Sequence, residues 1–170
     1  MFGHQVYFTI SVGYTTFVKN KVLEKVTAKD LYEISLMSAK SKEKQIYIYE
    51  ISNLSDIIGF KKAEILREEF LKNKIKVKQI TNNPMVPKFT DNDDFLKKLM
   101  DFRYVPKDIF EIKDEILIFD DVAATYNTEP KIKLLIIKNK DFANNQKQLF
   151  INLWKNAVFP KVDFESTLKK

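Results

Sequence analysis

The residues best placed to do chemistry gather in the segment EIKDEILIFDDVAATYN, residues 111–127. Two short apolar runs flank the pair Asp120-Asp121, a pattern that predicts a β-hairpin with an acidic turn. Lys113, Asp114 and Glu115 stand at the open end of this hairpin. A carboxylate or an amine at the end of a buried strand can transfer a proton, attack a substrate or clamp a phosphate. The same charges also suit an ordinary hairpin, because aspartate favours turns and strand ends are solvated.

Other reactive residue types are scarce. The chain has no cysteine and one histidine, His4, which excludes a disulfide framework, a thiolate zinc site and a multi-histidine metal site. The acidic cluster Asp91, Asp93 and Asp94 lacks the glycine and the distal glutamate of a calcium loop. It favours a helix N-terminus, with Thr90 or Asp91 as the capping residue. The sequence therefore predicts neither a metal site nor a cofactor.

Composition indicates a globular protein. The 170 residues are 45% hydrophobic and 31% charged, which predicts a single domain over residues 1–170. No apolar run approaches the roughly 20 residues that span a bilayer, and the start MFGHQVYFTISVGYTT does not resemble a signal peptide. We therefore expect a cytoplasmic protein without membrane contact. The net charge of +6 permits nucleic-acid binding, but the lysines are interleaved with acids and only two arginines occur.

The elements around the hairpin alternate between strand and helix periodicity. Residues 5–13 predict a strand, residues 14–26 are ambiguous and allow a short helix, and Thr27 with Asp30 predicts a capped helix start. The remaining expected elements are strands at 45–52, 75–81, 102–105 and 131–139, and helices at 60–74, 91–100 and 140–157. The expected buried stripes are Phe60, Ala63, Leu66 and Phe70 in one helix, and Phe142, Gln146, Leu149, Leu153 and Ala157 in another, where Phe150 and Trp154 widen the stripe. We expect a loop at 81–90 and a loose tail at 159–170.

From QIYIYEIS to LFINLWKNA, residues 45–157, the chain resembles the phospholipase D-like effector domain of TrmB-type transcriptional regulators. The resemblance is carried by QIYIYEIS, KNKIKVKQIT, FRYVPKDIF, EILIFDDVAATYN and IIKNKDFANNQKQLFINLW. It implies an α/β fold: one phospholipase D-like domain with a central mixed β-sheet flanked by helices.

The resemblance also aligns the hairpin with a known catalytic motif. Active enzymes of this type carry His-x-Lys-x-x-x-x-Asp there, with histidine as nucleophile and lysine as phosphate clamp. Aligning that aspartate with Asp120 puts Lys113 at the histidine position and Glu115 at the lysine position, while Asn127 matches a later asparagine. The resemblance thus implies no catalytic residues and a non-catalytic ligand-sensing or dimerisation domain.

Ligand and partner expectations follow from this reading. Open α/β sheets bind ligands at strand carboxyl ends, so the candidate ligand-binding residues are Ser52, Asn53, Lys113, Glu115, Asp120 and Asn127. We expect a homodimer with a small-molecule effector. Residues 1–44 are too short for a winged helix, so DNA contact would need an upstream domain or a partner chain. Two alternatives remain open: a diverged phosphodiesterase or nuclease using Lys113, and a basic nucleic-acid-binding module.

Overall fold

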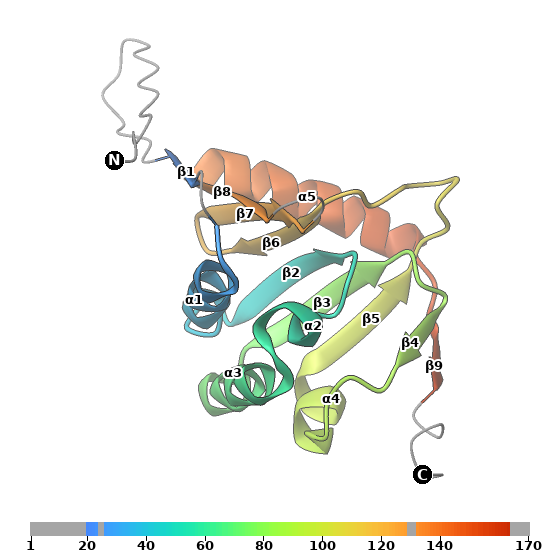
Figure 1. Ribbon diagram of the computed structural model, residues 1–170. Helices are drawn as coiled ribbons and strands as arrows, with labels where there is room; N and C mark the ends of the chain where they lie inside the picture. Colours follow the sequence, from blue (N-terminus) through green and yellow to red (C-terminus); the bar gives the residue numbers. More distant parts are fainter. Residues whose placement is uncertain (1–19, 24–25, 129–131, 164–170) are drawn as a thin grey trace.

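The computed structural model describes residues 20–23, 26–128 and 132–163 (Figure 1). The strands are β1 (Asn20–Leu23), β2 (Gln45–Glu50), β3 (Lys76–Thr81), β4 (Met85–Pro87), β5 (Met100–Tyr104), β6 (Glu115–Phe119), β7 (Val122–Asn127), β8 (Lys133–Lys138) and β9 (Lys161–Asp163). The helices are α1 (Ala28–Ser38), α2 (Leu54–Ile58), α3 (Phe60–Asn73), α4 (Asp93–Leu99) and α5 (Lys140–Asn156). Among these helices none is both long and apolar enough to cross a membrane.

Within the described residues, seven strands form one mixed sheet in the order β1-β8-β7-β6-β2-β3-β5. Strands β2, β3 and β5 are parallel, because helices carry the chain back between them, while β6, β7 and β8 form an antiparallel meander. Strand β6 joins the two halves by pairing antiparallel with β2. The start of β6 therefore lies at the same edge of the sheet as the carboxyl ends of β2 and β3.

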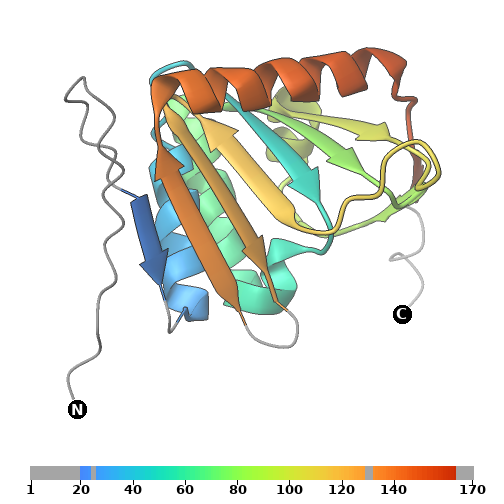
Figure 2. The same ribbon diagram turned by 90° about the horizontal axis from the view of Figure 1, so that it is seen from above.

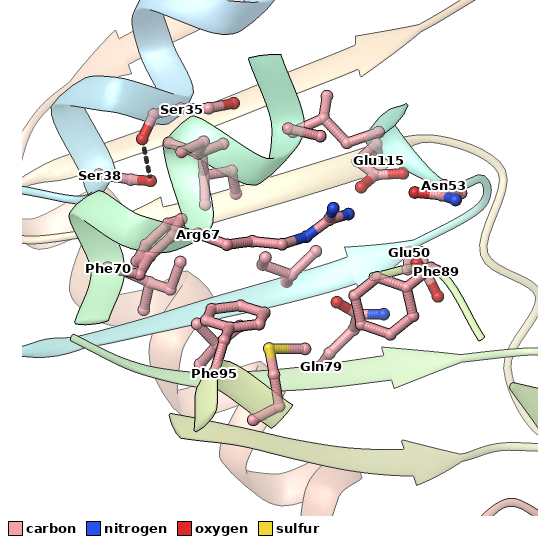
Figure 3. A pocket seen from close by; sticks show the side chains of 18 of the residues that line it. Ser35, Ser38, Glu50, Asn53, Arg67, Phe70, Gln79, Phe89, Phe95 and Glu115 are labelled. Atoms are coloured by element: carbon pink, nitrogen blue, oxygen red, sulfur yellow. Dashed lines mark hydrogen bonds between the residues drawn. The ribbon is translucent and has the colours of Figure 1, made fainter. Parts of the chain in front are cut away.

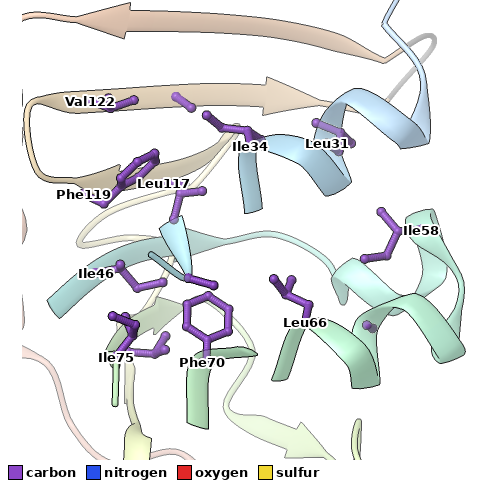
Figure 4. Packing of buried hydrophobic residues seen from close by; sticks show 14 of the residues in the cluster. Leu31, Ile34, Ile46, Ile58, Leu66, Phe70, Ile75, Leu117, Phe119 and Val122 are labelled. Carbon is purple, nitrogen blue, oxygen red and sulfur yellow. The ribbon is translucent and has the colours of Figure 1, made fainter. Parts of the chain in front are cut away.

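Helices cover both faces of the sheet. Helices α1 to α4 pack on one face, and α5 lies across the strands on the other (Figure 2). The larger core joins α1 through Leu31 and Ile34, and α3 through Leu66 and Phe70, to the sheet (Figure 4). The smaller core is built around Phe150 of α5, whose ring contacts Tyr47, Tyr49 and Trp154. The expected α/β architecture with a central mixed sheet is confirmed.

Several local predictions are also confirmed. Thr27 and Asp30 form the predicted reciprocal capping box at the start of α1. The hairpin of β6 and β7 turns at Asp120-Asp121. Asp120 adopts the left-handed conformation with φ of 46°, which aspartate tolerates better than most residues.

Other predictions are wrong at the level of elements. The loop at 81–90 contains β4, and residues 20–23, within the segment that the sequence left ambiguous, form a strand. Residues 161–163 of the expected loose tail form β9 and pair with β4. The expected strand at 5–13 lies outside the described residues. Pairing between distant segments created these short strands, and such pairing leaves almost no mark on local periodicity.

Helix ends and faces needed further correction. Asn92 caps α4, accepting a hydrogen bond from the Phe95 N–H, in place of Thr90 or Asp91. Phe60 is 51% exposed although it belongs to the expected stripe of α3. In α5 the buried face runs through Ala143, Lys147 and Phe150, which leaves Leu149 58% exposed. The wide apolar surface of α5 allowed two faces, and only docking on the sheet selected one.

Candidate functional site

A polar row crosses four neighbouring strands where β2 and β3 end and β6 begins. Glu50 stands beside Thr81 in the parallel register of β2 and β3, and Glu115 stands opposite Tyr126 in the hairpin. The antiparallel register of β2 and β6 pairs Tyr49 with Ile116, so its next step sets Glu50 against Glu115. Residues opposite one another on adjacent strands project from the same face. The fold thus brings two carboxylates together between a threonine and a tyrosine.

The loop that leads into β6 is fastened to the end of β3. The side chain of Asn82 donates to the carbonyls of Val105 and Phe110 and accepts from the Ile112 N–H at 2.7 Å. These bonds replace backbone pairing that the irregular segment 106–114 lacks. They hold the start of β6, and therefore Glu115, in place.

Glu115 is a buried carboxyl group, 6% exposed as a residue. One carboxylate oxygen accepts a hydrogen bond from the Ile51 N–H at 3.0 Å, and the Tyr126 side chain also bonds to this carboxylate. Burial raises the pKa of Glu115 to about 8, and the charge of Glu50 adds to the rise. The bonds from Ile51, Tyr126 and Ser52 oppose it only in part.

The pKa values of Glu50 and Tyr126 are raised as well. Burial raises the pKa of Glu50 to about 7, against the lowering effect of hydrogen bonds from Gln79 and Thr81. Burial, followed by the charge of Glu115, raises the pKa of Tyr126 well above its usual value of 10. The tyrosine is therefore neutral near pH 7, and the carboxyl pair retains protons that exposed carboxyls would have lost.

A cavity of about 90 Å³ opens beside this pair (Figure 3). Glu50, Asn53 and Glu115 gather at one end of it, and Phe70 and Phe95 line the other (Figure 3). The remaining lining residues are Ser35, Ser38, Ile46, Ile48, Ser52, Leu54, Ala63, Leu66, Arg67, Val77, Gln79, Phe89, Met100, Leu117 and Tyr126. The cavity is thus acidic at one end and apolar at the other.

Arg67 is the cationic side chain among these lining residues. Its guanidinium forms an ion pair with Glu64, donates to the Ser55 hydroxyl at 2.8 Å and stacks on the Phe89 ring. Thr90 donates to the same Glu64 carboxylate at 2.7 Å. The charge of Arg67 is therefore matched by Glu64, outside the pair of Glu50 and Glu115.

The turn end of the hairpin is a separate, structural cluster. The Asp120 carboxylate accepts hydrogen bonds from the Ser41 hydroxyl at 2.8 Å and from the backbone N–H groups of Lys42 and Glu43. The buried amine of Lys147 donates to the Asp120 carbonyl and to Glu43. These contacts tie the hairpin to the α1–β2 connection and to α5.

The predicted site residues therefore divide into two groups. Ser52, Asn53 and Glu115 line the cavity, and Asn53 also caps α2 by accepting from the Ser55 N–H. Lys113, Asp120 and Asn127 are not among the lining residues. Lys113 projects to the surface and pairs with Glu111 at 3.1 Å, while the amide of Asn127 donates to the Lys113 carbonyl. Whether the first three bind a ligand stays a prediction.

Sequence reasoning missed Glu50, Arg67, Gln79 and Tyr126 as cavity residues. A signal existed for Glu50, which is a lone acid inside the most apolar predicted strand, QIYIYEIS. A charged group at such a position is buried with a partner or placed for function. Arg67 gave no comparable signal, because an arginine in an amphipathic helix is ordinarily exposed.

Comparison with known proteins identifies the fold. No protein-family model matches the sequence, and no curated protein matches it significantly. Among solved structures, TrmBL2, an archaeal chromatin protein with a novel mode of DNA binding, superposes with a TM-score of 0.53 at 14% identity, covering 82% of this chain and 53% of that one. This chain thus matches about half the length of TrmBL2.

Two further solved structures are covered almost completely. NucT from Helicobacter pylori matches with a TM-score of 0.59 at 13% identity, covering 84% of this chain and 99% of NucT. Nuc, a phospholipase D family member from Salmonella typhimurium, matches with a TM-score of 0.52 at 13% identity, covering 85% and 98%. The chain has the phospholipase D-like α/β fold.

Proposed function

We propose that this chain is a non-catalytic phospholipase D-like module, a ligand-sensing or dimerisation domain related to transcriptional regulators. The observation that carries the proposal is the buried carboxyl pair of Glu50 and Glu115 at the cavity. In the alignment with the phosphodiesterase motif, an active enzyme would carry a phosphate-clamping lysine at position 115. A glutamate there holds the Ile51 N–H instead.

Electrostatics argues against phosphodiester chemistry at this pair. Phosphoryl transfer is accelerated by cations aimed at the phosphoryl oxygens, whereas two carboxyl groups would repel a phosphodiester whenever either is ionised. Lys113, the residue aligned with the histidine nucleophile, is exposed and paired with Glu111. Its place at the surface supports a solvated ion pair rather than a nucleophile enclosed in a site.

The experiment that tests the absence of catalysis is a hydrolysis assay with bis-p-nitrophenyl phosphate and with a single-stranded oligonucleotide. We expect no turnover above the blank between pH 5 and 9. Hydrolysis by the purified chain that disappears in Lys113→Ala would overturn the proposal and establish a diverged phosphodiesterase. Asp121→Ala, a turn variant outside the cavity, controls for contaminating nucleases.

Dimerisation is part of the proposal. A symmetric dimer is the commonest soluble assembly, and phospholipase D-like modules such as the one this chain resembles act in pairs. In such a regulator, DNA contact would come through a winged-helix domain or a partner chain. Light scattering coupled to gel filtration checks the assembly: a mass near twice 20.0 kDa supports a dimer, and 20.0 kDa contradicts it.

Direct nucleic-acid binding is the second candidate function, favoured by one cluster beyond the cavity. The Arg103 guanidinium lies 3.6 Å from the Phe159 ring centroid and 5.2 Å from that of Trp154, and Lys78 also lies over Trp154. Phe159 is 72% exposed. Cations beside exposed rings suit a single strand, whose bases stack while its phosphates are neutralised. Fluorescence anisotropy with an oligonucleotide checks this: affinity should fall steeply with salt and weaken in Phe159→Ala.

A further inference from the structure

We propose that the cavity beside Glu50 and Glu115 binds a compact organic cation, a primary alkylammonium group held between the two carboxylates with its alkyl part against the apolar wall. This inference rests on the proposed ligand-sensing function and names the chemical class of its ligand. It stands on the shape of the cavity, the placement of the acids and the matching of the surrounding charges.

The polar end supplies the recognition of the ammonium group. Glu50 and Glu115 face one another across β2 and β6, and each carboxylate has further oxygen lone pairs beyond those used by its hydrogen bonds. An ammonium group has three donors and one positive charge, which two carboxylates can share. The Asn53 side chain lies at the same end (Figure 3).

The apolar end of the cavity determines the size and polarity of the rest of the ligand. Phe70 and Phe95 line this end of the cavity (Figure 3), and aliphatic side chains complete the lining. The volume of about 90 Å³ admits a ligand of a few heavy atoms, well below the ~300 Å³ and more of pockets for drug-sized molecules. A short alkyl chain fits that wall.

The surrounding charges favour a cation over an anion. The groups that face the pair are Tyr126 from β7, which is neutral, Gln79 and Thr81 from β3, which are uncharged, and Arg67 from α3, whose charge is matched by Glu64. Glu50 also borders a second cavity of about 300 Å³, which Lys107 lines as well. Among the residues that the structure describes, neither carboxyl forms an ion pair, and burial favours their protonated form. A bound ammonium would replace those protons.

Calorimetric titration of the full chain with n-butylammonium chloride tests the proposal, with 1-butanol and sodium butyrate as neutral and anionic probes of the same chain length. We expect butylammonium alone to bind, and its affinity to rise from pH 6 to pH 8 by up to about tenfold per pH unit for each proton displaced. The heat of binding should differ between phosphate and Tris buffers at one pH, because released protons are taken up by the buffer.

Matched variants locate the site. Glu50→Gln and Glu115→Gln keep the side-chain shape and should each weaken binding at least about tenfold, since a charge-assisted hydrogen bond is lost. Glu111→Gln removes an exposed acid that pairs with Lys113 and should leave binding unchanged. Amide chemical shifts supply a second readout: the Ile51 N–H, bonded to Glu115, should move on titration with butylammonium.

The contrary outcomes separate this inference from the proposed function. Preferential binding of butanol, or of butyrate at Arg67, would overturn the inference that the ligand is a cation. The proposal of a ligand-sensing module would remain. If no probe binds and bis-p-nitrophenyl phosphate is not hydrolysed, the inference of a cation site is also overturned. The molar mass in solution would then test whether the chain is a dimerisation domain. Hydrolysis that depends on Lys113 would overturn the proposed function itself.

Discussion

The two ends of the β6–β7 hairpin treat acidic residues in opposite ways. At the turn, Asp120 accepts hydrogen bonds from Ser41, Lys42 and Glu43, and the Lys147 amine lies against its carbonyl. At the open end, Glu115 lies against a second acid, Glu50, and burial holds its pKa near 8. One strand separates the two environments.

The contrast distinguishes scaffold from candidate site within a single hairpin. The turn end satisfies each charge with a partner, so its contribution is stability. The open end keeps two acids together beside a cavity, an arrangement that costs free energy and is typical of binding and catalytic sites. Substitutions at either end test this contrast.

The largest expected effect comes from the turn end. Asp120→Ala should destabilise the fold by about 3 kcal/mol, because it removes a charged acceptor of several hydrogen bonds and puts alanine in a left-handed conformation. Urea denaturation measures the change. Asp121→Ala, the neighbouring turn residue, should cost less than about 0.5 kcal/mol, and an equal cost for both variants would contradict the structural role of Asp120.

The next effect is a pH dependence created by the open end. Between pH 5 and 8 the folded chain keeps a proton on Glu115 that the unfolded chain, with a pKa near 4.5, has released. Since the folded state binds more protons, stability falls as pH rises through this window. Glu115→Gln should be more stable than the parent chain by about 2 kcal/mol at pH 8.5, with little difference at pH 4.5. If the difference in unfolding free energy between Glu115→Gln and the parent chain were the same at both pH values, Glu115 would not have a raised pKa in the folded chain.

A smaller effect tests the coupling between the two acids. In Glu50→Gln the pKa of Glu115 should fall below about 8, because the charge of Glu50 is one of the causes of its rise. Carbon-detected NMR titration of the glutamate carboxyls measures this shift. The exposed variant Glu111→Gln serves as the control, and a Glu115 pKa that is the same in both variants would show that burial acts alone.

The smallest effect is expected at Lys113. Its ion pair with Glu111 is exposed, so Lys113→Ala should change the free energy of unfolding by less than about 0.5 kcal/mol. The same variant should leave the Glu115 titration in place. A large change in the free energy of unfolding or in the Glu115 titration would show that Lys113 interacts with the cavity residues.

Local sequence determined much of this protein. The capping box at Thr27, the hairpin around Asp120 and the strand QIYIYEIS follow from interactions within a few residues, and so does the placement of Ser52 and Asn53 directly after β2. The resemblance of residues 45–157 to phospholipase D-like domains also predicted the fold that the comparisons identify.

Only the tertiary structure decided the site. Glu50 and Glu115 are 65 positions apart in the chain, and they meet because β6 pairs antiparallel with β2 in one particular register. A shift of one residue would turn one of them to the other face of the sheet. Register, the docked face of α5 and the pairing of β4 with β9 all depend on long-range packing, which periodicity along a single segment does not encode.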